Sequence, residues 1–262
     1  MTEAHTRLEK LGPVLSFTFD RPDKYNAFTR SMLAALREAF ETFANDDELR
    51  VLLIRAKGKY FSSGMDVTTL GTGPEGEGAS SFRRRYRKDA WHQLYDEFEA
   101  LEKPIVVAHQ GPCLGAGLEM SLSCDFRLAS DAARYGLPEL NMGMIPGSGG
   151  TSRLVRTIGG HWARWLIMAN KQVDAERALN IGLIHDIYAA AEFDDQVEEF
   201  CQSLAREPAQ AMGTAKLAIE LAADLDRAQA RNMERLANSS LFQRDEQTRV
   251  FDALVSRFIK KK

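Results

Sequence analysis

The sequence predicts an α/β core followed by a region built almost entirely of helices. Over the first 150 residues, short apolar runs alternate with amphipathic patterns, which is typical of strand–helix–strand crossovers. From Thr151 onward, apolar residues recur at three- and four-residue spacing, as they do in amphipathic helices. The length of 262 residues suffices for one large domain or for a domain with a helical appendage.

The individual elements of the core follow from the apolar pattern. Short apolar runs predict buried strands at residues 14–19, 51–56, 104–111 and 126–130. Amphipathic patterns between them predict helices at residues 31–44 and 91–101. Residues 70–89 are Gly-rich and then strongly basic, so we expect a mobile surface loop that leads into a helix. No internal repeat of solenoid length is present.

Composition excludes several classes of protein. A formal net charge of -3 argues against a generic nucleic-acid surface, which normally has a basic excess. The three cysteines form no C-x-x-C pair, which favours free thiols in a reducing compartment over disulfides or a zinc site. The first residues carry no export or organelle signal, and no apolar run approaches the length of a membrane span. We expect a cytoplasmic protein, although a processed mature form would look the same.

Several stretches resemble familiar motifs without meeting their requirements. The stretch GTGPEG at residues 71–76 has the spacing G-x-G-x-x-G, but it contains Pro and Glu and no predicted helix opens there, so a flexible loop is the better interpretation. In PGSGG, Pro146 replaces the first glycine of G-x-S-x-G, which makes Ser148 a poor nucleophile. The five histidines are scattered, which favours surface or packed side chains over a metal site or a triad.

Three segments place small residues beside groups that can do chemistry. They span residues 58–66 (GKYFSSGMD), 110–120 (QGPCLGAGLEM) and 136–154 (GLPELNMGMIPGSGGTSRL). Two loops with glycine turns can direct backbone N–H groups at one point, as an oxyanion hole requires. Glu119 and Glu139 could then divide the roles of acid and base. Alternatively, the glycines serve only steric needs and Glu119 is a first-turn acid that favours its helix dipole.

These three segments, in this order, resemble the enoyl-CoA hydratase/isomerase (crotonase) superfamily. The resemblance begins at RPDKYNAF (residues 21–28) and continues through FSSGMDV, GPCLGAGLEMSLSCDFRLAS and YGLPELNMGMIPGSGGTSRL to DAERALNIGLIHDIY at residues 174–188. It covers most of the chain. The block G-x-P-E-x-x-x-G-x-x-P-G-x-G-G-T-x-R-L is its most specific part.

The resemblance implies a crotonase-like spiral of repeated ββα units at residues 1–200 and a C-terminal helical trimerisation region at residues 201–262. It implies a homotrimer or homohexamer, an acyl-CoA thioester as ligand, and no metal or separate cofactor, because CoA is part of the substrate. The oxyanion-hole N–H groups would be those of Met65 and Ala116. The hydratases often have Ala where Met65 stands, and Gly is frequent at the position of Ala116.

A glutamate at both family positions favours addition of water across the C2=C3 bond of a 2-enoyl-CoA, with Glu119 helping to activate water and Glu139 supplying a proton. The alternatives are an isomerase that uses mainly Glu139, a ring or branched acyl-CoA hydratase or dehydratase, and, more distantly, a non-catalytic or RNA-binding member. No nucleic acid or membrane partner is expected.

The resemblance also points to the groups that would bind CoA and substrate, with Lys24 as the candidate cation for the phosphates. The basic runs at residues 83–88 and 260–262 could also meet phosphates, but a solvated helix face and a frayed terminus are the more ordinary interpretations. The residues implied in binding are Lys24, Asn26, Ala27, Ser63, Gly64, Asp66 and Gly115.

Overall fold

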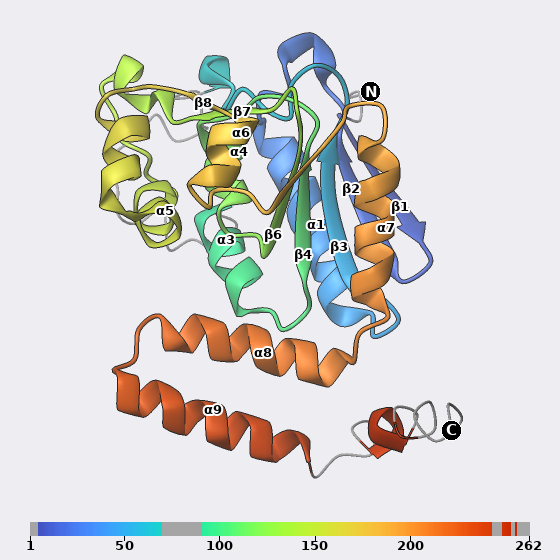
Figure 1. Cartoon of the computed structure of the whole chain (residues 1–262). Helices are drawn as coiled ribbons and strands as arrows, with labels where there is room; N and C mark the ends of the chain where they lie inside the picture. The colour runs from blue at the N-terminus through green and yellow to red at the C-terminus, as the bar shows by residue number, and fades with distance from the viewer. Residues whose placement is uncertain (1–4, 70–90, 243–247, 253–254, 256–262) are drawn as a thin grey trace.

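The computed structural model describes residues 5–69, 91–242, 248–252 and 255. The loop predicted at residues 70–89 and the basic runs at 83–88 and 260–262 lie outside the described residues. The centre of the molecule is a six-stranded sheet in the order β1-β2-β3-β4-β6-β9 (Figure 1). Its strands are β1 (Thr6–Leu11), β2 (Val14–Phe19), β3 (Val51–Ala56), β4 (Ile105–His109), β6 (Phe126–Ser130) and β9 (Asp186–Tyr188).

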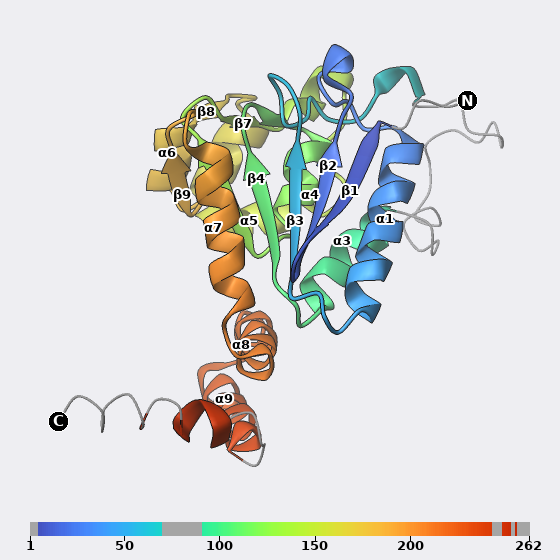
Figure 2. The same cartoon turned by 90° about the vertical axis from the view of Figure 1, so that its right-hand side faces the viewer.

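All pairings in this sheet are parallel except β1 with β2. The central strands are apolar on both faces because helices cover both. Leu52 and Ile54 of β3 point into one core, and Val51 and Leu53 point into the other. Figure 2 shows α1 (Arg30–Asn45) and α3 (Trp91–Ala100) on one side of the sheet and α7 (Phe193–Ala205) on the other.

A second, three-stranded sheet has the order β5-β7-β8. It contains the second strand of each of two successive ββα units. β4 is followed by β5 (Cys113–Leu114) and α4 (Ala116–Ser121). β6 is followed in the same way by β7 (Arg134–Gly136) and the 3₁₀ helix η3 (Pro138–Met142). Each unit therefore passes from the large sheet to the small one and then turns into a helix, and two successive units present their helix starts on the same side.

The remaining elements are mostly helical. α5 (Gly150–Ile167) is bent at Gly159, which has a left-handed φ of 73°. α8 (Ala209–Ala222) lies below the sheet and contacts the end of the α/β core, where Lys216 bonds to Phe98 and Asp125, and α9 (Arg227–Leu241) lies below α8 (Figure 1). These elements are η1 (Pro22–Lys24), η2 (Val67–Thr69), α5, β8 (Val173–Asp174), α6 (Ala175–Asn180), α7, α8 (Ala209–Ala222) and α9 (Arg227–Leu241).

The predicted strands and helices of the core are confirmed to within one or two residues at each end. The prediction of almost continuous helix after Thr151 is wrong at β8 and β9, because β9 pairs with β6 and extends the main sheet. β1 was not predicted, since its sequence TRLEKL is polar; as an edge strand it is mostly exposed and charged. A boundary between residues 200 and 201 falls inside α7, and the division into two regions stays a prediction.

Candidate active site

Two glycine turns touch at the end of the parallel strands. The segment after β3 lies against β5, where Ser62 bridges Cys113 and its carbonyl accepts the Leu114 N–H at 2.9 Å. A Cβ on Gly64, which has a left-handed φ of 103°, would lie 3.5 Å from Ala116 N and 3.6 Å from Gly115 Cα. The backbones of the two turns are therefore in van der Waals contact.

The backbone N–H groups of Met65 and Ala116 belong to the two turns that meet at this junction. Phe28 donates to the Gly64 carbonyl at 2.8 Å and accepts from Asp66 N at 3.0 Å. Because neighbouring residues of an extended segment point opposite ways, the N–H of Met65 is directed away from Phe28. Ala116 begins α4, so its N–H has no partner within the helix. Among the described residues, no protein oxygen accepts either group, and the pair fits an oxyanion hole.

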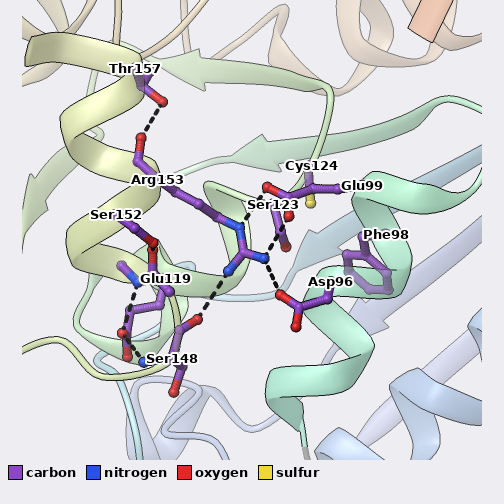
Figure 3. Close-up of polar contacts among 12 residues, drawn as sticks. Asp96, Phe98, Glu99, Glu119, Ser123, Cys124, Ser148, Ser152, Arg153 and Thr157 are labelled. Atoms are coloured by element: carbon purple, nitrogen blue, oxygen red, sulfur yellow. Dashed lines mark hydrogen bonds and ion pairs between the residues drawn. The ribbon is translucent and has the colours of Figure 1, made fainter. Parts of the chain in front are cut away.

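Glu119 lies one helical turn beyond Ala116 and is 4% exposed. Its Oε1 accepts the Ser148 N–H at 2.7 Å and the Gly150 N–H at 3.3 Å, both at the start of α5 (Figure 3). These donors, together with the positive end of α5, stabilise a negative charge on the carboxylate and fix its orientation. Glu119 is thus buried, but two backbone N–H groups supply the hydrogen bonds that its carboxylate would otherwise make with water.

Glu139 approaches the same junction from η3. A Cβ on Gly115 would lie 3.2 Å from Glu139 Oε1, so the carboxyl group lies against the Gly115 backbone. Within the described part of the chain, the buried Oε2 of Glu139 has no hydrogen-bond partner. Burial, and secondarily the charge of Glu119, raises the pKa of Glu139 from 4.5 to about 7. The two carboxyl groups therefore differ in environment: Glu119 accepts two backbone N–H groups, whereas Glu139 is driven toward the neutral acid, an arrangement that suits a base and an acid.

A cleft of about 430 Å³ adjoins the oxyanion-hole residues on the side of η1. Four of the predicted binding residues line it, and so does Met65. Asp66 in its wall is held by hydrogen bonds from Thr68 and from the Arg21 guanidinium at 2.7 Å, and these contacts lower its pKa. The lining residues are Asp23, Lys24, Tyr25, Ala27, Ser63, Met65, Asp66 and Val67.

Asn26 is placed differently from its neighbours. It is fully buried, with a left-handed φ of 51°, and its side chain accepts from Arg21 N and donates to the carbonyls of Lys57 and Tyr60 at 2.7–2.8 Å. Its own carbonyl accepts from Ser62 Oγ at 2.9 Å. Asn26 therefore shapes the turn behind the cleft and does not line it.

The groups that hold Glu119 were not predicted from the sequence. Ser148 was considered only as a nucleophile, whereas in the structure its N–H donates to Glu119 and its Oγ accepts from Trp91 Nε1 at 3.0 Å. The signal was present in P-G-S-G-G, because a glycine turn that opens a helix offers unpaired N–H groups to an anion. Tyr95 of α3 is also fully buried nearby, and burial, followed by the charge of Glu119, raises its pKa.

The prediction of packed histidines is confirmed for His109. It is fully buried between the hydroxyl groups of Tyr135 and Ser121, each at 3.0 Å, and burial lowers its pKa to about 3. In the described ranges, no group of three or more His, Cys, Asp or Glu side chains could hold a metal ion.

Comparisons with known proteins agree with this geometry. Residues 9–260 match the family model described as enoyl-CoA hydratase/isomerase. The chain is 31% identical over 251 residues to a short-chain-enoyl-CoA hydratase of Clostridium acetobutylicum, with 95% of this chain and 94% of that protein covered. It is 31% identical over 206 residues to the 2,3-dehydroadipyl-CoA hydratase of Escherichia coli, with 79% of this chain and 78% of that protein covered.

Solved structures show the same fold. The structure of an enoyl-CoA hydratase subunit from Geobacillus kaustophilus superposes with a TM-score of 0.88 at 27% identity, covering 97% of this chain and 96% of the other. The Bacillus anthracis enoyl-CoA hydratase superposes equally well, with a TM-score of 0.88 at 25% identity and 97% of both chains covered. The match over nearly the whole chain establishes that this protein belongs to the enoyl-CoA hydratase/isomerase family and has its crotonase fold.

Proposed function

We propose that this protein adds water reversibly across the C2=C3 double bond of a 2-enoyl-CoA thioester to give a 3-hydroxyacyl-CoA. One observation carries the proposal: two buried glutamates of unlike environment lie on segments that meet at the junction of two glycine turns, and among the described residues the N–H groups of Met65 and Ala116 in these turns have no acceptor. The hydratases of Clostridium acetobutylicum and Escherichia coli support it by their identity to this chain.

In this mechanism, the thioester oxygen accepts hydrogen bonds from the N–H groups of Met65 and Ala116. Water attack at C3 moves the electron pair of the double bond toward that oxygen, so negative charge develops between the two donors. Interactions that strengthen as the charge develops lower the barrier, and one such donor contributes about 3–4 kcal/mol.

Proton transfer is divided between the two carboxyl groups. The Glu119 carboxylate takes a proton from the attacking water, and the neutral Glu139 delivers a proton to C2. A carboxyl with a pKa of about 7 is suited to give up a proton near neutral pH. Water adds without any change of oxidation state, so the reaction requires no redox cofactor, and CoA enters as part of the substrate.

The cleft beside η1 supports binding of the CoA portion. Lys24 at its rim supplies a cation for the phosphates, while Ala27, Ser63 and Asp66 form the wall that continues to Met65. We assign Lys24, Ala27, Ser63 and Asp66 to the contacts with CoA, and Gly64 and Gly115 to the shape of the oxyanion hole.

The acyl group is proposed only as a class, because the two similar hydratases are named for different acyl chains. Ring and branched enoyl-CoA substrates use the same residues and stay alternatives, as does dehydration of a 3-hydroxyacyl-CoA. An isomerase would need mainly Glu139, so the ordered contacts of Glu119 with Ser148 and Gly150 favour the hydratase.

A panel of acyl-CoA thioesters varying in chain length, branching and ring content tests the proposal. We expect loss of the conjugated-thioester absorbance with at least one 2-enoyl-CoA. Glu119→Gln and Glu139→Gln should each lower kcat by about 10²–10⁴, the usual contribution of general acid–base catalysis. Normal turnover in Glu119→Gln with loss in Glu139→Gln would favour the isomerase. Salt-sensitive RNA binding without turnover would favour the RNA-binding alternative.

We also propose that the protein is a homotrimer or homohexamer. Several large apolar side chains of α8 and α9 are exposed in the single chain, including Ile219 at 70% and Leu236 at 74%. Burial of this face against another copy would remove it from water, and light scattering of the intact protein tests the assembly.

A cytoplasmic location is proposed as well. Cys113, Cys124 and Cys201 are buried free thiols, as expected in a reducing compartment. None of the helices in the described part of the chain is long and apolar enough to cross a membrane.

A further inference from the structure

The turn that precedes α5 is held from several sides at Ser148. The Ser148 N–H donates to Glu119 Oε1 at 2.7 Å, and its carbonyl accepts from Arg153 Nη1 at 3.2 Å (Figure 3). Its Oγ accepts from Trp91 Nε1 at 3.0 Å. Because both backbone groups of Ser148 are fixed, the direction in which its N–H points is fixed as well.

Arg153 is itself held rigidly by α3. Its side chain is 10% exposed, and its Nε and Nη2 each donate to a different oxygen of Glu99 at 2.6 Å. Nη2 also donates to Asp96 at 2.6 Å. A planar guanidinium with a bidentate carboxylate partner has little rotational freedom, so Nη1 is left pointing at the Ser148 carbonyl.

The two glycines of the turn show how closely it lies between charged groups. A Cβ on Gly149 would lie 1.8 Å from Arg153 Nη1, and a Cβ on Gly150 would lie 2.7 Å from Glu119 Oε1. Gly149 therefore makes room for the guanidinium, and Gly150 makes room for the catalytic carboxylate. The turn links Arg153 on one side to Glu119 on the other.

We propose that Arg153 is a positioning residue for the Glu119 carboxylate. By fixing the Ser148 carbonyl, it keeps the N–H of the same residue aimed at Oε1 and so keeps the carboxylate turned toward the reacting water. The Arg153 guanidinium is bound to Asp96, Glu99 and the Ser148 carbonyl, so in this proposal it acts through the turn and not on the substrate. The inference rests on the proposed function, because it gives Glu119 its role in activating water.

Steady-state kinetics of Arg153→Met and Arg153→Lys test the role. Met keeps the aliphatic part of the side chain. Lys keeps the charge but cannot form the bidentate pair with Glu99. We expect kcat to fall at least tenfold in Arg153→Met, with KM within twofold of wild type and Arg153→Lys intermediate. Arg156→Met is the matched control, because Arg156 lies on the same helix and pairs with Asp224 at 2.8 Å but is 60% exposed. Its kcat should be unchanged.

A double variant separates positioning from general damage. If Arg153 acts through Glu119, then Arg153→Met should lower kcat less than threefold in a Glu119→Gln background. A loss as large as in the wild-type background would overturn the proposal. So would a loss that appears only in KM, because that would place Arg153 in substrate binding.

Amide hydrogen exchange tests the same role without using activity. Exchange at Ser148 and Gly150 should accelerate in Arg153→Met, while exchange in β3 should stay as slow as in wild type. Unchanged exchange at the turn would refute the positioning role. If β3 also exchanges quickly, Arg153→Met is unfolded. Glu99→Gln then replaces it, because this change keeps Arg153 but weakens the bidentate pair between Arg153 and Glu99, and the same result is expected. If wild type hydrates no 2-enoyl-CoA, the proposed function fails, and hydrogen exchange alone then decides the role of Arg153.

Discussion

The burial of Glu139 should make the stability of this protein depend on pH in a defined direction. Burial raises the pKa of this carboxyl from 4.5 to about 7. The folded protein therefore holds this proton more tightly than the unfolded chain does. The associated stability is present below about pH 4.5 and is lost as the pH rises through about 7. Glu139→Gln cannot lose a proton, so the variant lacks this dependence.

The size of the effect follows from the pKa difference. For a carboxyl shielded completely from solvent, a change from 4.5 to about 7 corresponds to about 3 kcal/mol, at 1.36 kcal/mol for each factor of ten in proton affinity. We expect about 1–2 kcal/mol, because Glu139 faces a site that water must enter and solvent screens part of the interaction. That is about 2–8 °C in melting temperature for a chain of this length.

Thermal unfolding of wild type and Glu139→Gln at pH 5, 6, 7 and 8 measures this difference. The melting temperature of the variant relative to wild type should rise by about 2–8 °C between pH 5 and pH 8. Glu38→Gln, a change at an exposed position of α1, is the control and should show no such trend. A difference between Glu139→Gln and wild type that stays constant over this range would refute the reasoning.

Two further substitutions test the oxyanion hole and the attachment of α8. Gly115→Ala should lower kcat about ten- to a hundredfold, because Gly115 has a φ of 53° and the added Cβ would lie 3.2 Å from Glu139 Oε1. Gly12→Ala has a similar left-handed φ in open space, so it should retain kcat; equal kcat in both variants would contradict the assignment. Lys216→Met should destabilise folding by about 3 kcal/mol in denaturant unfolding, because it breaks the buried pair with Asp125 at 2.9 Å. Adding Asp125→Asn should restore part of that loss, and no recovery would show that the ion pair is not the cause.

Local pattern was sufficient for the strands with strong apolar runs and for the amphipathic helices. β3 was predicted from residues 51–56 alone, since side chains buried on both faces of a parallel sheet leave a continuous apolar run. β1 and β9 were not predicted, because a polar edge strand and a three-residue strand carry no apolar periodicity of their own. Their pairing with β2 and β6 stabilises them, and pairing depends on residues distant in the sequence.

For the candidate site, too, some features follow from the sequence alone and others only from the tertiary structure. The sequence by itself determined which residue types are available: the glycines that allow two turns to touch, the two glutamates, and the family to which they belong. Only the tertiary structure decided that Ser148 and Gly150 donate to Glu119, that Asn26 lies behind the cleft, and that Glu139 has a pKa near 7. The physical reason is that desolvation and hydrogen-bond direction are set by every group around a side chain, and these groups come from segments that only folding brings together.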